Sequence, residues 1–214
     1  MIRTLRNKKI LVTCGPTWVA IDPVRVISNI SSGEMGHRLA RGLLKGGAKV
    51  TLLEGPVMHP LDDHGIEVFR FRYFEELEEL LRRELRKGYA AVIHAAAVAD
   101  FRSAKISRKK INSHAGGLLL RLIPTPKLIN DIKKIAPQTF LIGFKLHPGL
   151  TSKSARSESR TLFRDSHCDL VVANTLSKAG YRAWVLNRHA KILFQADSRQ
   201  HLADQLTRLL AHCL

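Results

Sequence analysis

Short apolar runs that alternate with helical periods are the feature of this sequence that most restricts its fold. Residues 10–14, 48–53 and 90–97 are nearly continuous apolar runs of strand length. Between them, residues 34–45 and 74–87 place leucines at helical spacing. Strands that are apolar on both faces are typical of a parallel sheet covered by helices on both sides. We therefore predict a Rossmann-like, three-layer α/β/α fold with a mostly parallel central sheet.

The rest of the chain continues this pattern within what we predict to be a single domain of residues 1–214. The further strands are expected at 66–71, 118–123, 140–144 and 170–173, the further helices at 126–135 and 155–164, an antiparallel hairpin at 182–186 with 191–195, and a final helix after Asp197 and Ser198. The C-terminal antiparallel hairpin is expected to close one edge of the sheet.

The charge balance narrows the range of partners. The chain has 35 Lys and Arg against 18 Asp and Glu, a formal net charge of +17, which favours anionic ligands. No apolar run is long enough to span a membrane, and the N-terminus lacks the apolar stretch of a signal peptide. Three widely spaced cysteines form no disulfide framework. We therefore expect a cytoplasmic protein.

Three long loops should carry the chemistry, because ligands of such sheets bind beyond the carboxyl ends of the strands. The three loops are residues 15–33, 97–117 and 145–154. In the first, Ser31, Ser32 and Gly33 precede a helix, where hydroxyls, free N–H groups and the helix dipole can bind an anion. The alternative is that a serine only caps the helix and Gly36 lets it pack on the sheet.

The second loop combines one acid, Asp100, with a dense run of bases. Nine Lys or Arg residues stand between positions 102 and 134 against a single acid, Asp131; they are Arg102, Lys105, Arg108, Lys109, Lys110, Arg121, Lys127, Lys133 and Lys134. A bound polyphosphate would relieve their repulsion, and the alternative is a solvated charged flap. His94 lies in an apolar run, so we interpret it as a core histidine.

The helix after the third loop carries Arg160 and Arg164, four residues apart and therefore on one face. They could share a phosphate chain, and the alternative is an ordinary exposed helix face. Cys14 ends the first strand and is interpreted as a small buried hydrophobe. The ten histidines and three cysteines show no metal-ligand spacing, so the sequence assigns no metal ligand.

Several motifs together resemble the phosphopantothenoylcysteine synthetase family. In chain order they are Val12–Thr17, Ile21–Arg25, Ile27–Gly36, Ala96–Arg102, Pro124–Pro126, Ile142–Phe144 and Asp169–Asn174. They keep the family's order over most of the chain, and the combination is far more specific than any one motif.

The resemblance implies a ligase of coenzyme A synthesis. A nucleoside triphosphate, CTP in bacterial members and ATP in eukaryotic ones, activates the carboxylate of 4′-phosphopantothenate as an acyl-nucleotidyl anhydride. Pyrophosphate leaves, and the amine of cysteine then attacks to give 4′-phosphopantothenoylcysteine and the nucleoside monophosphate. The resemblance also implies Mg²⁺ with the triphosphate and a homodimer. Because no flavin-binding decarboxylase half is present in this sequence, we expect that activity on another chain.

Residue roles follow from the same resemblance. Lys110 matches the essential flap lysine and Asn29 matches the asparagine that holds the intermediate or phosphopantothenate, so these two are the implied catalytic residues. The implied phosphopantothenate site comprises Asn29, Ser31, Ser32, Gly33, Ala96 and Ala97. The implied nucleotide site comprises Gly15, Ala95, Ala96, Ala97, Asp100, Lys110, Pro126, Lys127, Leu128, Ile129, Phe144, Arg160 and Arg164. The sequence departs from the family at Ile30 and after Lys110, where Asn112-Ser113 replace further lysines.

Two other classes of protein fit parts of the sequence. An NAD(P)-dependent reductase is suggested by Gly33, Gly36 and Glu54, although 18 residues separate Cys14 from Gly33 where a glycine turn should follow the strand directly. A nucleic-acid-binding module is suggested by the net charge of +17, although no recognised motif or aromatic platform accompanies it.

Overall fold

A computed structural model describes residues 4–113, 116–178 and 180–214, and it is built on one central sheet. The eight strands lie in the order β12-β11-β10-β9-β6-β1-β4-β5. Their bounds are β1 (Lys9–Cys14), β4 (Lys49–Glu54), β5 (Ile66–Arg70), β6 (Ala91–His94), β9 (Phe140–Leu146), β10 (Leu170–Ser177), β11 (Gly180–Asn187) and β12 (Ile192–Ala196). The neighbours from β5 to β10 pair in parallel and the last two pairings are antiparallel. The predicted parallel sheet and C-terminal hairpin are therefore confirmed.

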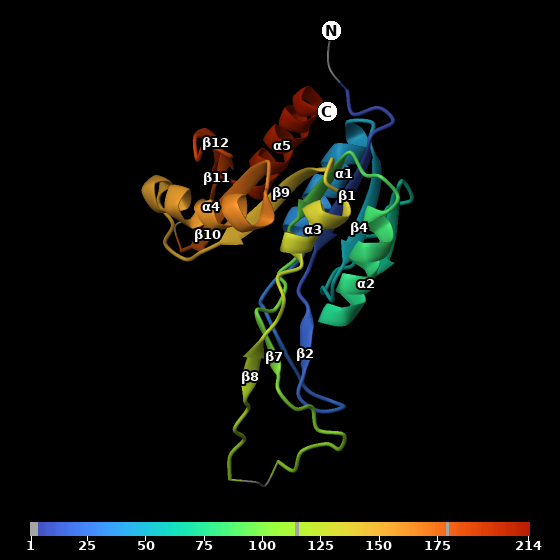
Figure 1. Cartoon of the computed structure of the whole chain (residues 1–214), viewed down its shortest axis with the longest axis vertical. Coiled ribbons are helices and arrows are strands. Elements are labelled where there is room, and N and C mark those ends of the chain that lie inside the picture. Colours follow the sequence, from blue (N-terminus) through green and yellow to red (C-terminus); the bar gives the residue numbers. More distant parts are fainter. Residues whose placement is uncertain (1–3, 114–115, 179) are drawn as a thin grey trace.

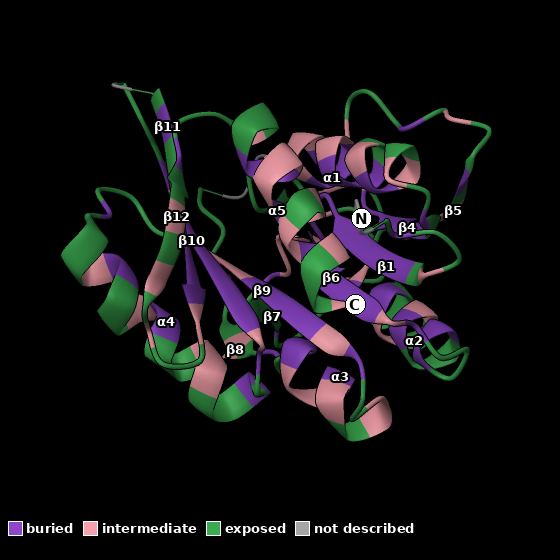
Figure 2. Cartoon of the chain, turned by 90° about the horizontal axis from the view of Figure 1, so that it is seen from above, coloured by how far each residue is buried: buried purple, intermediate pink, exposed green. Residues whose placement is uncertain are grey.

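Helices cover both faces of this sheet, as Figure 2 shows from above. They are α1 (Glu34–Lys45) and α5 (Arg199–Cys213) on one face, and α2 (Phe74–Leu85), α3 (Ile129–Ile135) and α4 (Ser152–Ser166) on the other. A hydrophobic core lies on each face of the sheet, and successive residues of β1 point into one or the other. Ile10 and Val12 pack toward α1, and Leu11 packs toward α2. Each such buried side chain contributes about 1.5–3 kcal/mol, which explains the unbroken apolar runs.

Helix α1 packs closely on β1 because residue 36 is a glycine. A Cβ added to Gly36 would lie 2.2 Å from the Cβ of Cys14, a separation that packed atoms do not adopt. Cys14 itself is 1% exposed, so both sequence-based interpretations, of Gly36 as a packing residue and Cys14 as a buried small side chain, are confirmed.

Two hairpins that the sequence pattern did not predict leave the carboxyl edge of the sheet. They are β2 (Trp18–Ala20) with β3 (Val26–Ser28), and β7 (Phe101–Ser103) with β8 (Leu122–Pro124). We call residues 17–30, 98–113 and 116–124 together the arm. The predicted strand at 118–123 is wrong in place and extent, because only Leu122–Pro124 pair and they pair with β7 outside the main sheet. Leu119 is 98% exposed, so its apolar character does not mark a core strand.

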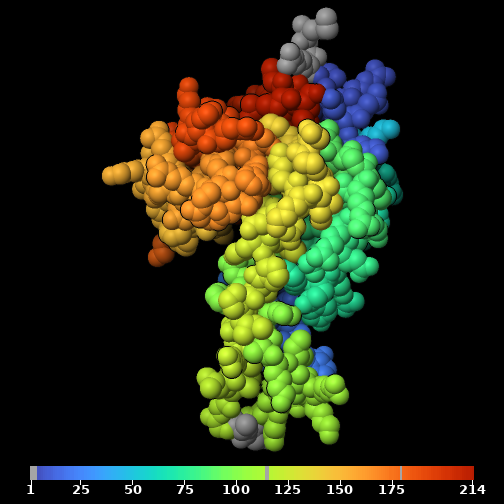
Figure 3. Space-filling view, in the orientation of Figure 1, coloured from blue at the N-terminus to red at the C-terminus, as the bar shows by residue number. Residues whose placement is uncertain are grey.

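The two halves of the arm are bonded to each other and project from the body of the molecule (Figures 1 and 3). The Ser103 hydroxyl donates to the carbonyl of Ala20 at 2.9 Å, and the N–H of Ser107 donates to the carbonyl of Ile21 at 3.0 Å.

The third predicted loop is shorter than expected, because β9 extends to Leu146 and α4 begins at Ser152. Within the described residues, no helix combines the length and the apolar character needed to cross a membrane.

Candidate functional site

The first two loops run side by side where β1 and β6 end. Gly15 has a φ of +76°, and its carbonyl accepts a hydrogen bond from the N–H of Ala97 at 2.8 Å. Thr17 N–H donates in turn to the Ala97 carbonyl at 3.3 Å, and its hydroxyl accepts from Ala99 N–H at 2.9 Å. A Cβ at residue 15 would lie 3.0 Å from the backbone of Gly55, so this crossing requires glycine.

His94 lies next to this crossing and is linked to it through a hydrogen bond with Thr13. Its Nδ1 lies 3.1 Å from the hydroxyl of Thr13, which also accepts from the N–H of Ala96 at 3.1 Å. Burial lowers the pKa of His94 to about 4. The imidazole is therefore neutral at pH 7, and the interpretation as a satisfied core histidine is confirmed.

Asn29 lies against the start of the second loop, as the family resemblance implies for a site residue. Its side-chain amide donates to the carbonyl oxygens of Ala97 and Val98 at 3.1 and 3.3 Å. Both amide hydrogens are thus used within the protein. Among the described residues no donor reaches its Oδ1, so this oxygen is available to accept from a ligand.

A pocket of about 210 Å³ adjoins Asn29 between the two hairpins of the arm. It is lined by Val19, Ile27, Ser28, Asn29, Ala99, Asp100, Phe101 and Leu122. Small-molecule sites usually have at least about 300 Å³, so this pocket has room for only part of a ligand of that size. The structure thereby brings two implied site residues, Asn29 and Asp100, to one cavity.

Asp100 also connects the pocket to the segment after β8. Its carboxylate forms an exposed ion pair with Lys127, and its carbonyl accepts from Thr125 N–H at 3.0 Å. Exposed ion pairs contribute at most about 1 kcal/mol, so a ligand can displace this one. Leu128 and Ile129, by contrast, are buried in the core beneath α2. Their side chains are packed in the core, so any contact of these two residues with a nucleotide would come from their backbone.

The basic run divides into paired and unpaired cations. Lys127, Lys133 and Lys134 form ion pairs with Asp100, Asp169 and Asp131. Among the described residues no carboxylate pairs with the six remaining, all exposed on the arm: Arg102, Lys105, Arg108, Lys109, Lys110 and Arg121. Because these charges have no counter-ion within the described chain, the arm is the part that favours a polyanion.

The backbone beside Lys110 is held by Asp22, a residue to which the sequence assigned no role. One carboxylate oxygen of Asp22 accepts from Ile111 N–H at 3.1 Å, and Arg25 donates to the Ile111 carbonyl at 3.1 Å. Burial alone would raise the pKa of Asp22, but backbone N–H groups of Val24, Ile111 and Arg25 and the charge of Arg25 hold it below its ordinary value. In the sequence, the Asp22-Pro23 pair, which is typical of a turn, is the feature that could have indicated this structural role of Asp22.

The start of α1 differs from a serine-capped helix. Gly33 is the capping residue, with a φ of +73° and no side-chain hydrogen bond to the helix. The hydroxyls of Ser31 and Ser32 accept only from the N–H groups of Gly33 and Glu34, both at 3.4 Å. Gly33 rather than a serine is therefore the N-cap residue, although the Ser32 hydroxyl still accepts from the N–H of Glu34, the first residue of the helix.

In the part of the chain that the structure describes, Arg160 and Arg164 form no hydrogen bond or ion pair with another implied site residue. Helix α4 runs antiparallel to β9 and β10, so its last turns lie toward the amino ends of the strands. Arg164 is in that part and binds Asp165 at 2.6 Å. The four-residue spacing correctly puts the two arginines on one face, but it says nothing about which end of the helix faces the ligand edge. Phe144 is half-buried in β9 against the core.

One further residue stands out at the strand ends. Asn174 lies in β10 beside Leu146 of β9, and its Oδ1 is buried without a hydrogen-bond partner in the described chain.

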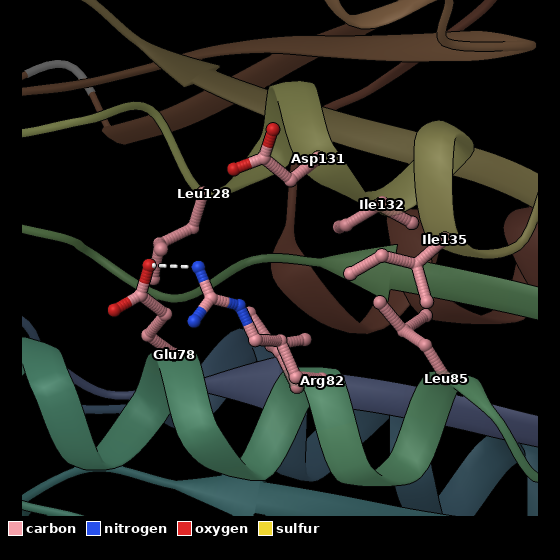
Figure 4. Close-up of a pocket in the computed structure, with 8 residues that line it drawn as sticks. Glu78, Arg82, Leu85, Leu128, Asp131, Ile132 and Ile135 are labelled. Atoms are coloured by element: carbon pink, nitrogen blue, oxygen red, sulfur yellow. Dashed lines mark hydrogen bonds and ion pairs between the residues drawn. The ribbon is translucent and has the colours of Figure 1, made fainter.

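A second pocket, between α2 and α3, has a volume of about 10 Å³ and is far smaller than the pocket beside Asn29 (Figure 4). The Glu78–Arg82 ion pair and Leu85, Leu128 and Ile132 line it. A space of this size holds one water molecule at most.

The geometry disfavours dinucleotide binding. The whole β2–β3 hairpin stands between β1 and the glycines that open α1. Glu54, the residue that would bind a ribose, is instead buried and accepts hydrogen bonds from His37, from Leu61 N–H and from Arg70.

Known proteins match most of the chain. Residues 5–214 match the family described as the DNA/pantothenate metabolism flavoprotein C-terminal domain. A curated relative, the coenzyme A biosynthesis bifunctional protein CoaBC of Thermococcus kodakarensis, is 41% identical over 180 residues, which are 83% of this chain and 44% of the relative. The chain thus spans about half the length of the curated relatives it matches.

Solved structures agree with the fold. The DNA/pantothenate metabolism flavoprotein from Streptococcus pneumoniae matches with a TM-score of 0.86 at 26% identity, covering 97% of this chain and 100% of that one. The C-terminal domain of a coenzyme A biosynthesis bifunctional protein CoaBC matches with a TM-score of 0.80 at 22% identity, covering 99% and 97% of the two chains.

Proposed function

Because the chain belongs to the family of the DNA/pantothenate metabolism flavoprotein C-terminal domain, we propose that it joins 4′-phosphopantothenate to cysteine. The observation that carries this proposal is the convergence of Asn29, the Ala97–Asp100 turn and Lys127 around one pocket at the strand ends. The six arm cations that pair with no carboxylate of the described residues extend from the same place. A site of this composition suits a reaction between two phosphorylated molecules.

The reaction has two steps. A carboxylate oxygen of phosphopantothenate attacks the α-phosphorus of the nucleotide, and pyrophosphate leaves. The cysteine amine then attacks the acyl carbon, the nucleoside monophosphate leaves and the amine releases a proton. A mixed anhydride is reactive enough that the amine needs no strong general base.

The residues of the chain contribute mainly charge and position. Lys110 would neutralise the triphosphate as charge builds on the leaving pyrophosphate, an effect worth roughly 10²-fold or more in rate for one preorganised donor. The hydrogen bonds of Asp22 and Arg25 to Ile111 fix the backbone next to this lysine. Asn29 would accept through Oδ1 from an N–H or hydroxyl of the phosphopantothenate chain.

Mg²⁺ and the nucleotide base belong to the same proposal. Asp100 offers an exposed carboxylate beside the pocket, and hard oxygen ligands of this kind, with phosphate oxygens, suit Mg²⁺. Asp100 would hold the ion, which when bound neutralises phosphate charge. We favour CTP over ATP because of the resemblance to bacterial members of the family.

The arm also supports a homodimer. Val26, Ile27, Phe101 and Leu122 are exposed on its hairpins, and Ile30 is fully exposed. Apolar side chains gathered on one projection favour burial against a partner, and a second copy of this chain is the partner we propose. Sedimentation of the wild type and of Ile30→Asp would test this, because the substitution should favour the monomer.

Pyrophosphate release tests the activity. The full chain is incubated with phosphopantothenate and each of the four nucleoside triphosphates, with and without cysteine, and products are identified by mass spectrometry. We expect pyrophosphate release with CTP and the cysteine adduct only when cysteine is present. Release that is independent of phosphopantothenate, or absent with all four nucleotides, would contradict the proposal.

A further inference from the structure

A second group of reactive side chains lies at the sheet edge and has no role in the proposed reaction. Cys14 is the last residue of β1, Glu54 is the last residue of β4, and His37 is in the first turn of α1. One ligand atom of each residue lies within 4.8 Å of the ligand atoms of the other two. The three residues stand 17 or more positions apart in the chain, so no short metal-ligand spacing marks them in the sequence.

All three side chains are withdrawn from solvent. Cys14 is 1% exposed, and the side chains of Glu54 and His37 are 1% and 11% exposed. The Nε2 of His37 lies 2.7 Å from Oε1 of Glu54. Gly36 makes the approach possible, since any side chain there would collide with Cys14 and keep α1 away from β1.

We propose that Cys14, His37 and Glu54 form a binding site for a Zn²⁺-like divalent transition metal ion. Sulfur, imidazole nitrogen and carboxylate oxygen are the donor set that Zn²⁺ and Co²⁺ accept, whereas Mg²⁺ and Ca²⁺ require oxygen ligands. Three protein ligands leave the fourth tetrahedral position to a water molecule. The site is distinct from Asp100, the proposed ligand for the Mg²⁺ that accompanies the nucleotide.

The surroundings of Glu54 suit a metal ligand. Its carboxylate also accepts from Leu61 N–H at 2.8 Å and from Arg70 at 3.1 Å, and such outer contacts orient ligands and hold them in place. Metal binding would replace the hydrogen bond between His37 and Glu54 with two metal bonds. The Cys14 thiol would lose its proton to solvent, and thiolate and carboxylate together would balance the charge of the ion.

A bound ion would have a defined structural effect. It would join β1, β4 and α1 at one point, next to the turn that starts α1. His37 N–H already donates to the carbonyl of Gly33 at 3.1 Å. The ion would therefore stiffen the Ser31–Gly33 turn without touching the pocket between the hairpins.

Cobalt titration tests this site independently of any enzymatic activity. The full chain is freed of metal with a chelator and titrated with Co²⁺, which gives a thiolate charge-transfer absorption when sulfur coordinates it. We expect one equivalent to bind, the absorption to appear and Zn²⁺ to displace it. Cys14→Ala should abolish the absorption and weaken binding more than about 100-fold, since loss of an outer contact alone costs 10–100-fold.

Three further variants keep the test decisive. Cys168→Ala removes the other buried thiol, and Cys213→Ala removes the exposed one; both should retain the absorption. His37→Gln keeps a hydrogen-bond donor toward Glu54 and should fold, as circular dichroism will show, yet bind Co²⁺ at least 100-fold more weakly. No thiolate absorption in the wild type, its persistence in Cys14→Ala, or unchanged affinity in His37→Gln would overturn the proposal.

Discussion

Replacement of Gly36 by alanine tests the close packing of α1 on β1. The new Cβ would lie 2.2 Å from the Cβ of Cys14 and 3.1 Å from its sulfur, so the helix must move by more than about 1 Å to reach an ordinary contact. Overpacking of this kind costs about 3 kcal/mol, while alanine in place of glycine returns about 1 kcal/mol of helix propensity. We therefore expect a net loss of about 2 kcal/mol in the free energy of unfolding.

Guanidinium unfolding followed by circular dichroism measures this loss. For a chain of this length, 2 kcal/mol corresponds to a fall in Tm of roughly 4–8 °C, with an unchanged denaturant slope. Gly42→Ala is the matched control, because it lies in the same helix and its Cβ would meet only the Thr207 hydroxyl at 3.0 Å. That variant should stay within about 1 kcal/mol of the wild type. A Gly36→Ala protein as stable as Gly42→Ala would refute the packing argument.

Three further predictions concern the site. Lys110→Ala should slow pyrophosphate release roughly 10²-fold or more, whereas Arg164→Ala, at the far end of α4, should stay within about twofold; equal losses in single-turnover assays would contradict the assignment. Asn29→Ala should keep the fold, measured by circular dichroism, but release activated intermediate without converting it, and a wild-type yield of cysteine adduct would count against its role. Burial lowers the pKa of His94 to about 4, so between pH 4 and about 6.5 the unfolded chain binds more protons than the folded chain. The free energy of unfolding should therefore fall by about 3 kcal/mol as the pH drops through that window. In urea titrations at several pH values, His94→Gln should show a smaller fall.

The sequence predicts the central sheet and its helices well, because strands that are buried on both faces appear in the sequence as nearly continuous apolar runs. The helix predicted at 34–45 is α1 with the same bounds, Glu34–Lys45. The runs at 10–14 and 48–53 lie within one residue of β1 and β4. In these segments the local pattern and the tertiary environment favour the same structure.

The arm was less predictable because its strands have three residues each. Segments this short carry no clear period, and exposed apolar side chains such as Leu119 imitate a core strand. The family resemblance singled out Asn29 and Asp100, and in the structure both residues line one pocket. It could not show that Leu128 and Ile129 face the core, or that Cys14, His37 and Glu54 meet, since both depend on packing between distant segments.

The division of the basic run means that ionic strength acts differently on two parts of the molecule. In the body, Lys133 bridges to the largely buried carboxylate of Asp169 at 2.7 Å, a distance at which mobile ions screen weakly. The lone cations of the arm attract their partners through solvent, where the Debye length shrinks to about 8 Å at physiological salt. Added salt should thus weaken the affinity of the arm for anions at concentrations that leave the stability of the fold nearly unchanged.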